Sequence, residues 1–211
     1  MATAPSPSIP SALEGRVLND APISADEYLQ RERATAGERH EYVHGWLIDM
    51  AAAASWSHSV ITSNLDRELG LQLKETDCRT ASRDLIVPFP ETDRYAYPDL
   101  VVVCGGPALD ADRSDLLYNP AVVFEVLSPS TEGYDRGEKF AHYRQLESLQ
   151  EYFLVAQDRP HIEHYVRQAD GSWRFTETDA LDTAVTCPSL DVTLPLSEVY
   201  LDVSFDSDEN E

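Results

Sequence analysis

YPDLVVVC at residues 97–104 and AVVFEVL at residues 121–127 are the two runs that decide the fold of this chain. Both runs are rich in β-branched residues, and neither has a polar face, which is typical of strands in the centre of a sheet. Each run nevertheless carries one acid, Asp99 or Glu125. A carboxylate buried without a partner costs several kcal/mol, on the order of the penalty for any unpaired buried charge. The pattern therefore predicts that a cation faces both acids.

Lys139 is a candidate for a positive charge beside these acids. The chain has only two lysines, Lys74 and Lys139, among its 16 lysine and arginine residues. Lys139 follows a polar turn and lies in a helical pattern, where Arg136, Lys139 and Tyr143 have the spacing i, i+3 and i+7 that places them on one stripe. This stripe can face the end of the strand that contains Glu125.

Two carboxylates with water molecules suit Mg²⁺ or Mn²⁺, which prefer oxygen ligands. Such an ion lowers the pKa of bound water and stabilises charge on a phosphoryl group, and a nearby lysine can orient or deprotonate the nucleophile or stabilise developing charge. Less specific interpretations stay open. Asp99 can be a turn residue after a proline, Glu125 can pair with a buried arginine, and Lys139 can lie on a solvated helix face.

Length and composition predict one domain with tails. The 211 residues suit a single core. We predict a flexible N-terminal arm over 1–23, a folded domain over 24–201 and a disordered acidic tail over 202–211. No apolar run is long enough for a membrane span, and the start has no signal-peptide pattern. Three widely spaced cysteines without a CxxC motif favour a reducing, cytoplasmic location and argue against a zinc site.

The net charge of −22 disfavours tight nonspecific binding of nucleic acid, because phosphates are bound by basic surfaces. If nucleic acid is the substrate, the groove is expected to be a local basic patch in an otherwise negative molecule, and binding is expected to be weak and salt-sensitive. The candidates for this patch are Arg83, Arg136, Lys139 and Arg144.

The order of patterns predicts an α+β domain with a mixed central sheet flanked by helices. Ser24 and Glu27 have capping-box spacing, and a His44-Gly45 turn is predicted to join two short strands. The expected helices are 24–33, 57–75, 135–146 and 196–201, and the expected strands lie within 39–52, 78–82, 84–89, 97–104, 121–127, 151–156, 161–167, 173–178, 183–187 and 190–194. The helix at 135–146 is expected to be capped by Asp135, with Glu138 three residues later.

Four blocks of sequence resemble the Uma-two family of bacterial endonuclease-like proteins in the PD-(D/E)xK superfamily. The blocks are Glu41–Gly45, Tyr97–Asp99, Glu125–Thr131 and Tyr134–Lys139 with Tyr143. The resemblance covers about residues 24–201. It implies a restriction-endonuclease-like fold and a Mg²⁺-dependent phosphodiester site, with Asp99 and Glu125 as metal ligands and Glu41 as a further acid of the site.

One position departs from the superfamily pattern. The lysine expected two residues after the glutamate is replaced by Leu127, and related sequences are understood to carry it on the following helix, which makes Lys139 its replacement. His58, Asp84, Arg136 and Tyr143 are candidates for residues that surround the site.

The leading hypothesis is therefore a cytoplasmic Mg²⁺- or Mn²⁺-dependent nuclease that acts on nucleic acid, with DNA favoured and no membrane partner. A homodimer is left open by the sequence. Two alternatives remain: a catalytically inactive binding or regulatory module with the same fold, and a purely structural ion-pair network of Asp99, Glu125 and Lys139.

Overall fold

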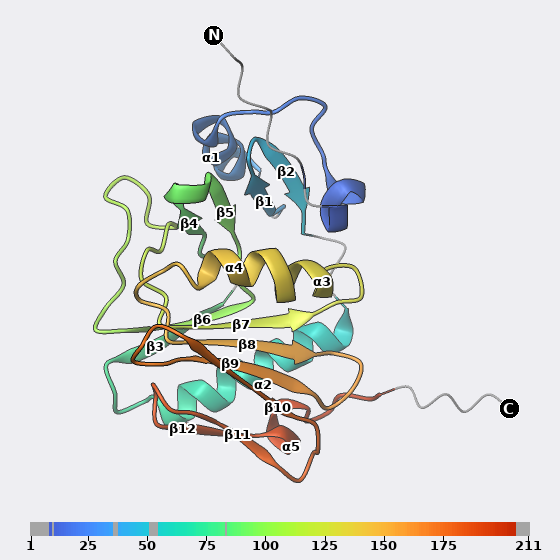
Figure 1. Ribbon diagram of the computed structural model, residues 1–211, viewed down its shortest axis with the longest axis vertical. Helices are drawn as coiled ribbons and strands as arrows, with labels where there is room; N and C mark the ends of the chain where they lie inside the picture. Colours follow the sequence, from blue (N-terminus) through green and yellow to red (C-terminus); the bar gives the residue numbers. More distant parts are fainter. Residues whose placement is uncertain (1–8, 10, 36–37, 51–54, 83, 206–211) are drawn as a thin grey trace, which may run out of the picture.

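The computed structural model describes residues 9, 11–35, 38–50, 55–82 and 84–205. A large sheet is covered by helices on both faces, and a smaller sheet lies beyond one of these helical layers (Figure 1). The helices are η1 (Ser11–Arg16), α1 (Ala25–Ala34), α2 (Trp56–Gln72), η3 (Pro90–Thr92), α3 (Glu132–Tyr134), η4 (Asp135–Lys139), α4 (Phe140–Tyr143) and α5 (Leu196–Val199). The strands are β1 (His40–Val43), β2 (Trp46–Asp49), β3 (Cys78–Ser82), β4 (Val87–Phe89), β5 (Arg94–Ala96), β6 (Leu100–Cys104), β7 (Val122–Leu127), β8 (Glu151–Ala156), β9 (Ile162–Arg167), β10 (Trp173–Thr178), β11 (Ala184–Cys187) and β12 (Val192–Pro195).

The large sheet has the strand order β10-β9-β8-β7-β6-β3. Strands β7 and β8 are parallel and the other neighbours are antiparallel, so the sheet is mixed, as the sequence predicts. All residues of β7 are buried. The two runs that open the sequence argument are therefore central strands that face protein on both sides.

Helix α2 covers one face of this sheet. Its side chains Ile61, Leu65 and Leu69 are fully buried and pack with Phe124 and Phe153 of the sheet. Each such side chain contributes about 1.5–3 kcal/mol of hydrophobic free energy relative to exposure. Ser55 caps the helix by accepting a hydrogen bond from the His58 backbone amide, so the sequence-predicted helix begins near its predicted start.

The opposite face is covered by the segment of α3, η4 and α4, which lies between the two sheets (Figure 1). Its central part, η4, is a π-helical turn that includes Asp135 and Lys139. Asp135 is buried inside this segment, so it is not the helix cap that the sequence pattern predicts. Helix formation begins three residues earlier, at Glu132.

Three other local predictions require correction. Residues 11–16 of the predicted flexible arm form η1, where Leu13 is buried against Ile48 and Val43. Strand β5 was not predicted at all, although it joins the β1–β2 hairpin to β4. In the predicted tail, Phe205 packs on the core and stacks edge-on with Tyr200. Residues 1–8, 10 and 206–211 lie outside the described residues.

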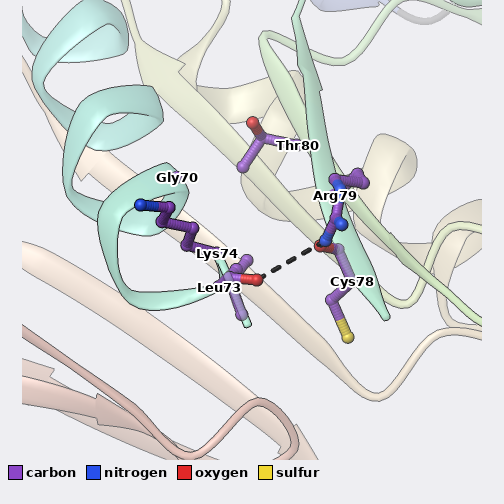
Figure 2. A pocket seen from close by; sticks show the side chains of 6 residues that line it. All are labelled: Gly70, Leu73, Lys74, Cys78, Arg79 and Thr80. Carbon is purple, nitrogen blue, oxygen red and sulfur yellow. Dashed lines mark hydrogen bonds between the residues drawn. The ribbon is translucent and has the colours of Figure 1, made fainter. Parts of the chain in front are cut away.

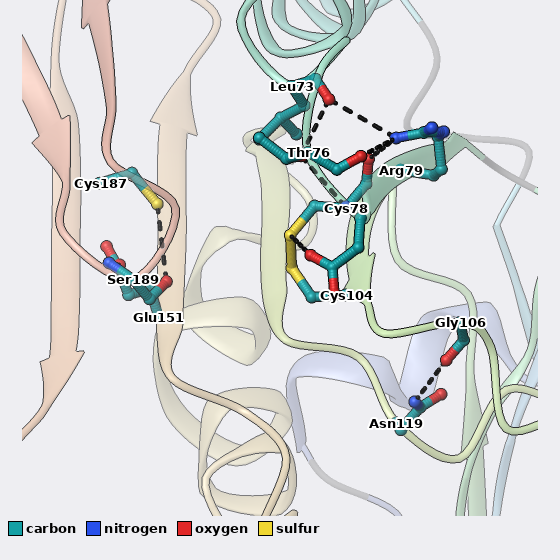
Figure 3. Close-up of a disulfide and its surroundings, with 11 residues drawn as sticks. Leu73, Thr76, Cys78, Arg79, Cys104, Gly106, Asn119, Glu151, Cys187 and Ser189 are labelled. Carbon is teal, nitrogen blue, oxygen red and sulfur yellow. Dashed lines mark hydrogen bonds between the residues drawn. A yellow bond between two sulfur atoms is a disulfide. The ribbon is translucent and has the colours of Figure 1, made fainter.

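Two of the three cysteines form a disulfide. Cys78 of β3 and Cys104 of β6 are direct partners in the antiparallel ladder, and their sulfurs are bonded (Figure 3). The third cysteine, Cys187, is free and buried. Because two of the three cysteines are bonded, their number and spacing no longer favour a reducing, cytoplasmic location. The sequence did not indicate this pairing, since the register of two strands brings together residues that are far apart in the sequence.

No helix among the described residues has both the length and the apolar character that crossing a membrane requires.

Candidate functional site

Asp99 and Glu125 meet at one end of β6 and β7. The antiparallel register pairs Leu100 with Phe124, so the next pair along the two chains is Asp99 with Glu125. Residues directly opposite each other in an antiparallel pair project from the same face. That face is the one covered by α3, η4 and α4, because Val123 and Leu127 on the same side pack with Phe140 and Tyr143.

Asp99 is held by groups from two other elements. Its Oδ2 accepts a hydrogen bond from the Val126 backbone amide at 2.8 Å and lies 3.1 Å from Nε2 of His58 at the start of α2. Burial alone raises the pKa of Asp99, but the hydrogen bond from His58, the charges of His58 and Lys139 and the Val126 amide outweigh it. The pKa of Asp99 therefore lies below its ordinary value, and the carboxylate is ionised at neutral pH.

Lys139 reaches the site from η4 and is 2 % exposed. Its Nζ lies 2.9 Å from Oε1 of Glu125, 2.9 Å from Oε1 of Glu41 and 3.7 Å from Oδ1 of Asp135. The ammonium also donates to the Tyr97 carbonyl at 3.4 Å. A turn and the first part of a helix thus fold back over the strand end, as the spacing between Glu125 and Lys139 predicts.

Glu41 comes from the other sheet. It lies in β1 and is 1 % exposed, with its side chain on the face of the hairpin that contacts Lys139, opposite to Tyr42. Neither of its carboxylate oxygens has a hydrogen-bond partner among the described residues, and Oε1 has only the Lys139 ammonium. This buried carboxylate is incompletely satisfied, which is costly unless a further cation or water molecule binds.

The site contains more negative than positive charge. Glu41, Glu125 and Asp135 are buried and Asp99 is partly buried, and these four acids face one ammonium and one imidazole. Burial raises the pKa of Glu125 well above its ordinary value, and the neighbouring acids raise it further against the opposing charge of Lys139. An excess of buried carboxylates of this kind is the electrostatic environment that a divalent cation stabilises.

Lys139 is the protonated partner in this network. Burial lowers the pKa of its ammonium, but the carboxylates of Glu125, Glu41 and Asp135 outweigh burial and hold the pKa well above the ordinary value. In this arrangement Lys139 is a fixed positive charge. It has no free amine with which to act as a base.

A divalent ion fits the donors of the site in part. Asp99 and Glu125 lie opposite each other, and all four acids offer the oxygen ligands that Mg²⁺ and Mn²⁺ prefer. However, the acids do not gather as three ligand atoms within 4.8 Å; among the residues that the structure describes, only Asp77, Cys78 and Cys104 do, and the two sulfurs of that group are bonded to each other. The donors at the strand ends therefore suit an ion held by two carboxylates with water completing its shell.

Of the four residues predicted to surround the site, two do so. His58 is buried and contacts Asp99. Tyr143 is fully buried, and its hydroxyl has no hydrogen-bond partner among the described residues. Burial raises the pKa of its phenol, and the charge of Glu125 raises it further against that of Lys139.

Asp84 and Arg136 do not join the cluster. Asp84 is exposed after the end of β3 and pairs with Arg39. Arg136 pairs with Glu132 and Glu163, each at 2.6 Å. The π-helical turn explains the error for Arg136, because a wider turn places Lys139 beneath Asp135 and moves Arg136 away from the stripe predicted for a regular α-helix.

The predicted basic patch does not form from its described members. Arg136 is neutralised by two glutamates, Lys139 is buried, and Arg144 is exposed beyond the end of α4. Arg83 lies outside the described residues. Asp135 is the site residue that sequence reasoning missed, since an acid in a helix-start pattern is usually a cap. Its i, i+4 spacing to Lys139 was the available signal.

Asp135 also predicts a pH dependence of stability. Burial is the largest cause that raises its pKa, from 3.8 to about 6. Because the folded state binds this proton more tightly than the unfolded state, the stabilisation is present at acid pH and is lost as pH rises from about 4 through about 6. We expect Asp135→Asn to flatten the fall in the free energy of unfolding across this window by about 1 kcal/mol or more.

Chemical denaturation at a series of pH values measures this effect. Glu147→Gln removes the same formal charge at an exposed acid and is the matched control. Equal pH profiles for the two variants would show that Asp135 does not titrate in this window.

Comparisons with known proteins identify the family of this chain. Residues 25–197 match the model of the Uma2 family, described as "Putative restriction endonuclease". An uncharacterized Synechocystis protein, sll1609, is 36% identical over 155 residues, which cover 74% of this chain and 86% of that protein. A second uncharacterized Synechocystis protein, slr1290, is 33% identical over 183 residues, which cover 87% of this chain and 94% of that protein.

A solved structure shares the fold. The crystal structure of a putative nuclease of DUF820 from Anabaena variabilis superposes with a TM-score of 0.67 at 21% identity, covering 85% of this chain and 98% of that one. This similarity shows that the mixed sheet and its helices form a restriction-endonuclease-like fold. Residues 25–197, which match the family model, include both strands of the acidic cluster and the helix with Lys139. Because this match covers most of the chain, the chain belongs to the Uma2 family.

Proposed function

We propose that this protein is a metal-dependent nuclease that hydrolyses phosphodiester bonds of nucleic acid, with Mg²⁺ or Mn²⁺ as the ion. The observation that carries the proposal is the convergence of Glu41, Glu125 and Asp135 on the buried Lys139 ammonium, with Asp99 at the adjacent end of β6. Stability alone does not require such a cluster, because apolar side chains of similar volume are usually as stabilising as a buried ion pair. Family membership supports the same activity.

Each residue has a distinct role in the proposed reaction. Asp99 and Glu125 would hold the ion, which when bound supplies Lewis-acid stabilisation of the phosphate and a more acidic water molecule. His58 and the Val126 amide fix the orientation of Asp99. Lys139, which stays protonated, stabilises negative charge that develops at the phosphate. Glu41 holds the ammonium in place from the opposite side.

The substrate is proposed to be DNA that is bound weakly and in a salt-sensitive way. The cations near the site are engaged in internal ion pairs, and the whole chain carries a net charge of −22. Few phosphates can be neutralised, so affinity is expected to be low at physiological salt.

The test of function is a cleavage assay. Purified protein is incubated with single-stranded DNA, duplex DNA and RNA in the presence of Mg²⁺, Mn²⁺ or a chelator. Cleavage of one of these substrates that depends on the metal and is lost in Glu125→Gln supports the proposal. Cleavage that persists equally in Glu125→Gln would be that of a contaminant.

Metal binding can be measured separately from cleavage. Added Mg²⁺ is expected to raise the thermal midpoint, since an ion that binds only the folded state stabilises it by about 2.7 kcal/mol at 100 times its Kd. The shift should disappear in Asp99→Asn and persist in Asp84→Asn, where the replaced acid is exposed and outside the cluster. A shift of equal size in both variants would place the ion elsewhere.

A catalytically inactive binding module is the second candidate function. It is favoured by the position of the Lys139 ammonium between Glu41 and Glu125, where it occupies the centre of the acidic cluster. Binding of DNA without cleavage under any metal, in a protein that also shows no Mg²⁺-dependent thermal shift, would support this function over the nuclease.

A further inference from the structure

A surface pocket lies beside the disulfide, at the end of β6 opposite to the acidic site. It has a volume of about 300 Å³ and is lined by Gly70, Leu73 and Lys74 at the end of α2 and by Cys78, Arg79 and Thr80 of β3 (Figure 2). The lining combines one sulfur of the disulfide with two cationic side chains. Neither Lys74 nor Arg79 forms an ion pair with another described residue, and both are exposed.

Arg79 is held in place beside Cys78. Its Nη1 donates to the carbonyl oxygens of Cys78 at 2.6 Å, Thr76 at 2.8 Å and Leu73 at 3.5 Å (Figure 3). These bonds close the end of α2 against β3 and use only one of the guanidinium nitrogens. The positive charge is therefore fixed at the pocket, while Lys74, in the turn that follows α2, adds a second one.

The local charge is unusual for this molecule. The chain carries a net charge of −22 and has only two lysines, of which one is buried in the acidic site and the other lines this pocket. Lys74 and Arg79 are the charged residues among the six that line the pocket, so the charge of the lining itself is positive. Asp77 is the acid nearest to the sulfur, with its Oδ1 3.7 Å from Cys78 Sγ, but it is not among the lining residues.

The disulfide can open without disrupting the sheet. Cys78 and Cys104 form the first pair of the β3–β6 ladder, and four further residue pairs keep the two strands together. Strand β3 is at the edge of the sheet, so it has β6 as its one ladder partner. Cleavage of the bond between the two sulfurs therefore breaks no backbone hydrogen bond of the ladder.

We propose that the Cys78–Cys104 disulfide is a thiol-exchange site, at which the pocket receives a low-molecular-weight anionic thiol. The thiolate of that molecule attacks Cys78 Sγ, the bond to Cys104 Sγ breaks, and its electron pair leaves with Cys104 as a thiolate that takes a proton from water. The products are a mixed disulfide on Cys78 and a free thiol on Cys104. The step needs no other oxidant or reductant. The carboxylates of the small thiol would lie against Lys74 and Arg79.

A series of three thiols tests the proposal on the full chain, isolated without reductant. The series is 3-mercaptopropionate, 2-mercaptoethanol and cysteamine, which are anionic, neutral and cationic. Each rate is divided by the rate of the same thiol with a small symmetrical disulfide, which corrects for intrinsic nucleophilicity. The anionic thiol is expected to react fastest, by on the order of five-fold over the cationic one, since one charge contact at a surface has about this effect.

Matched charge reversals identify the pocket as the cause. Lys74→Glu should remove or reverse the preference for the anionic thiol, whereas Arg144→Glu, which makes the same change in net charge at an exposed residue of another element, should not. Mass spectrometry of peptides after alkylation should find the adduct on Cys78 and the alkyl group on Cys104. Cys187 serves as an internal reference, because it is buried and burial raises the pKa of its thiol.

Three results would overturn the proposal. They are equal corrected rates for the three thiols, an equal effect of Lys74→Glu and Arg144→Glu, and an adduct on Cys104 in place of Cys78. Isolation of the protein with Cys78 and Cys104 as free thiols would also refute it, since the starting disulfide would not exist. All of these measurements can be made on protein whose fold is verified by its circular dichroism.

Discussion

Lys139→Met is expected to destabilise the protein by about 3–5 kcal/mol at neutral pH, which is the usual cost of removing one partner from a buried ion pair. The ammonium lies 2.9 Å from both Glu41 and Glu125, and methionine would leave these buried acids without a cation. Cleavage should be lost as well. A residue that is 2 % exposed and contacts three carboxylates contributes to the stability of the fold as well as to the chemistry of the site.

The pH dependence of Lys139→Met separates this mechanism from simple loss of packing. Burial raises the pKa values of Glu125 and Asp135, and without the ammonium the charge that opposes this rise is lost. Their protonated forms then stabilise the fold at acid pH, and this stability is lost as pH rises through the raised pKa values of the two acids. The variant should therefore approach the wild-type thermal midpoint near pH 4 to 5 and fall well below it at pH 7.5.

Two further variants complete this experiment. Adding Glu41→Gln to Lys139→Met should recover part of the lost stability at pH 7.5, because one uncompensated charge is removed. Lys74→Met is the control, since Lys74 is the other lysine of the chain and is exposed. A thermal midpoint of Lys139→Met within one degree or so of wild type at both pH values would contradict the importance of the ion pairs.

Glu125→Gln is expected to lower metal-dependent cleavage by about 1,000-fold or more, the scale seen when one member of a catalytic unit is removed. Glu125 would be a metal ligand, and its carboxylate also contacts Lys139. An amide keeps the size of the side chain but ligates a hard cation less well than a carboxylate does. Initial rates on the best substrate, at saturating Mg²⁺, provide the measurement.

The same variant should keep or gain stability. Burial and the like charges of neighbouring acids raise the pKa of Glu125. A neutral amide therefore removes a desolvation cost and repulsion, while Glu41 and Asp135 still hold Lys139. Loss of cleavage with an unchanged or raised thermal midpoint would establish a chemical role. Glu91→Gln, at an exposed acid, controls for net charge; a loss of similar size there would mean that the general electrostatic field is responsible.

Patterns of neighbouring residues were sufficient for much of the fold. Buried strands β6 and β7 were predicted because apolar residues occupy both faces, and that pattern depends only on local sequence. The β1–β2 hairpin followed from its turn residues, His44 and Gly45, which both have positive φ angles. Strand β5 was missed because three residues between turns carry too short a pattern to recognise.

The sequence predicted which residues belong to the acidic site better than it predicted the contacts among them. Asp99, Glu125 and Lys139 were identified from buried-strand patterns, composition and family resemblance, and the structure brings them together with Glu41. The partner of Arg136 and the burial of Asp135 could not be predicted, because they depend on a π-helical turn. One extra residue in a helical turn rotates every later side chain about the helix axis. No local sequence pattern predicts where such a residue is inserted.

Sequence by itself determined which residues must be buried, since hydrophobic periodicity is a local property, and it therefore indicated where unpaired acids would need a cation. Only the tertiary structure decided which charges meet. Glu41 and Lys139 are separated by nearly a hundred positions and lie on different layers, yet their charged atoms are 2.9 Å apart. The same holds for Cys78 and Cys104, which pair because two strands align in one register. Such contacts depend on the packing of whole elements, whose relative positions the free energy of the complete core determines.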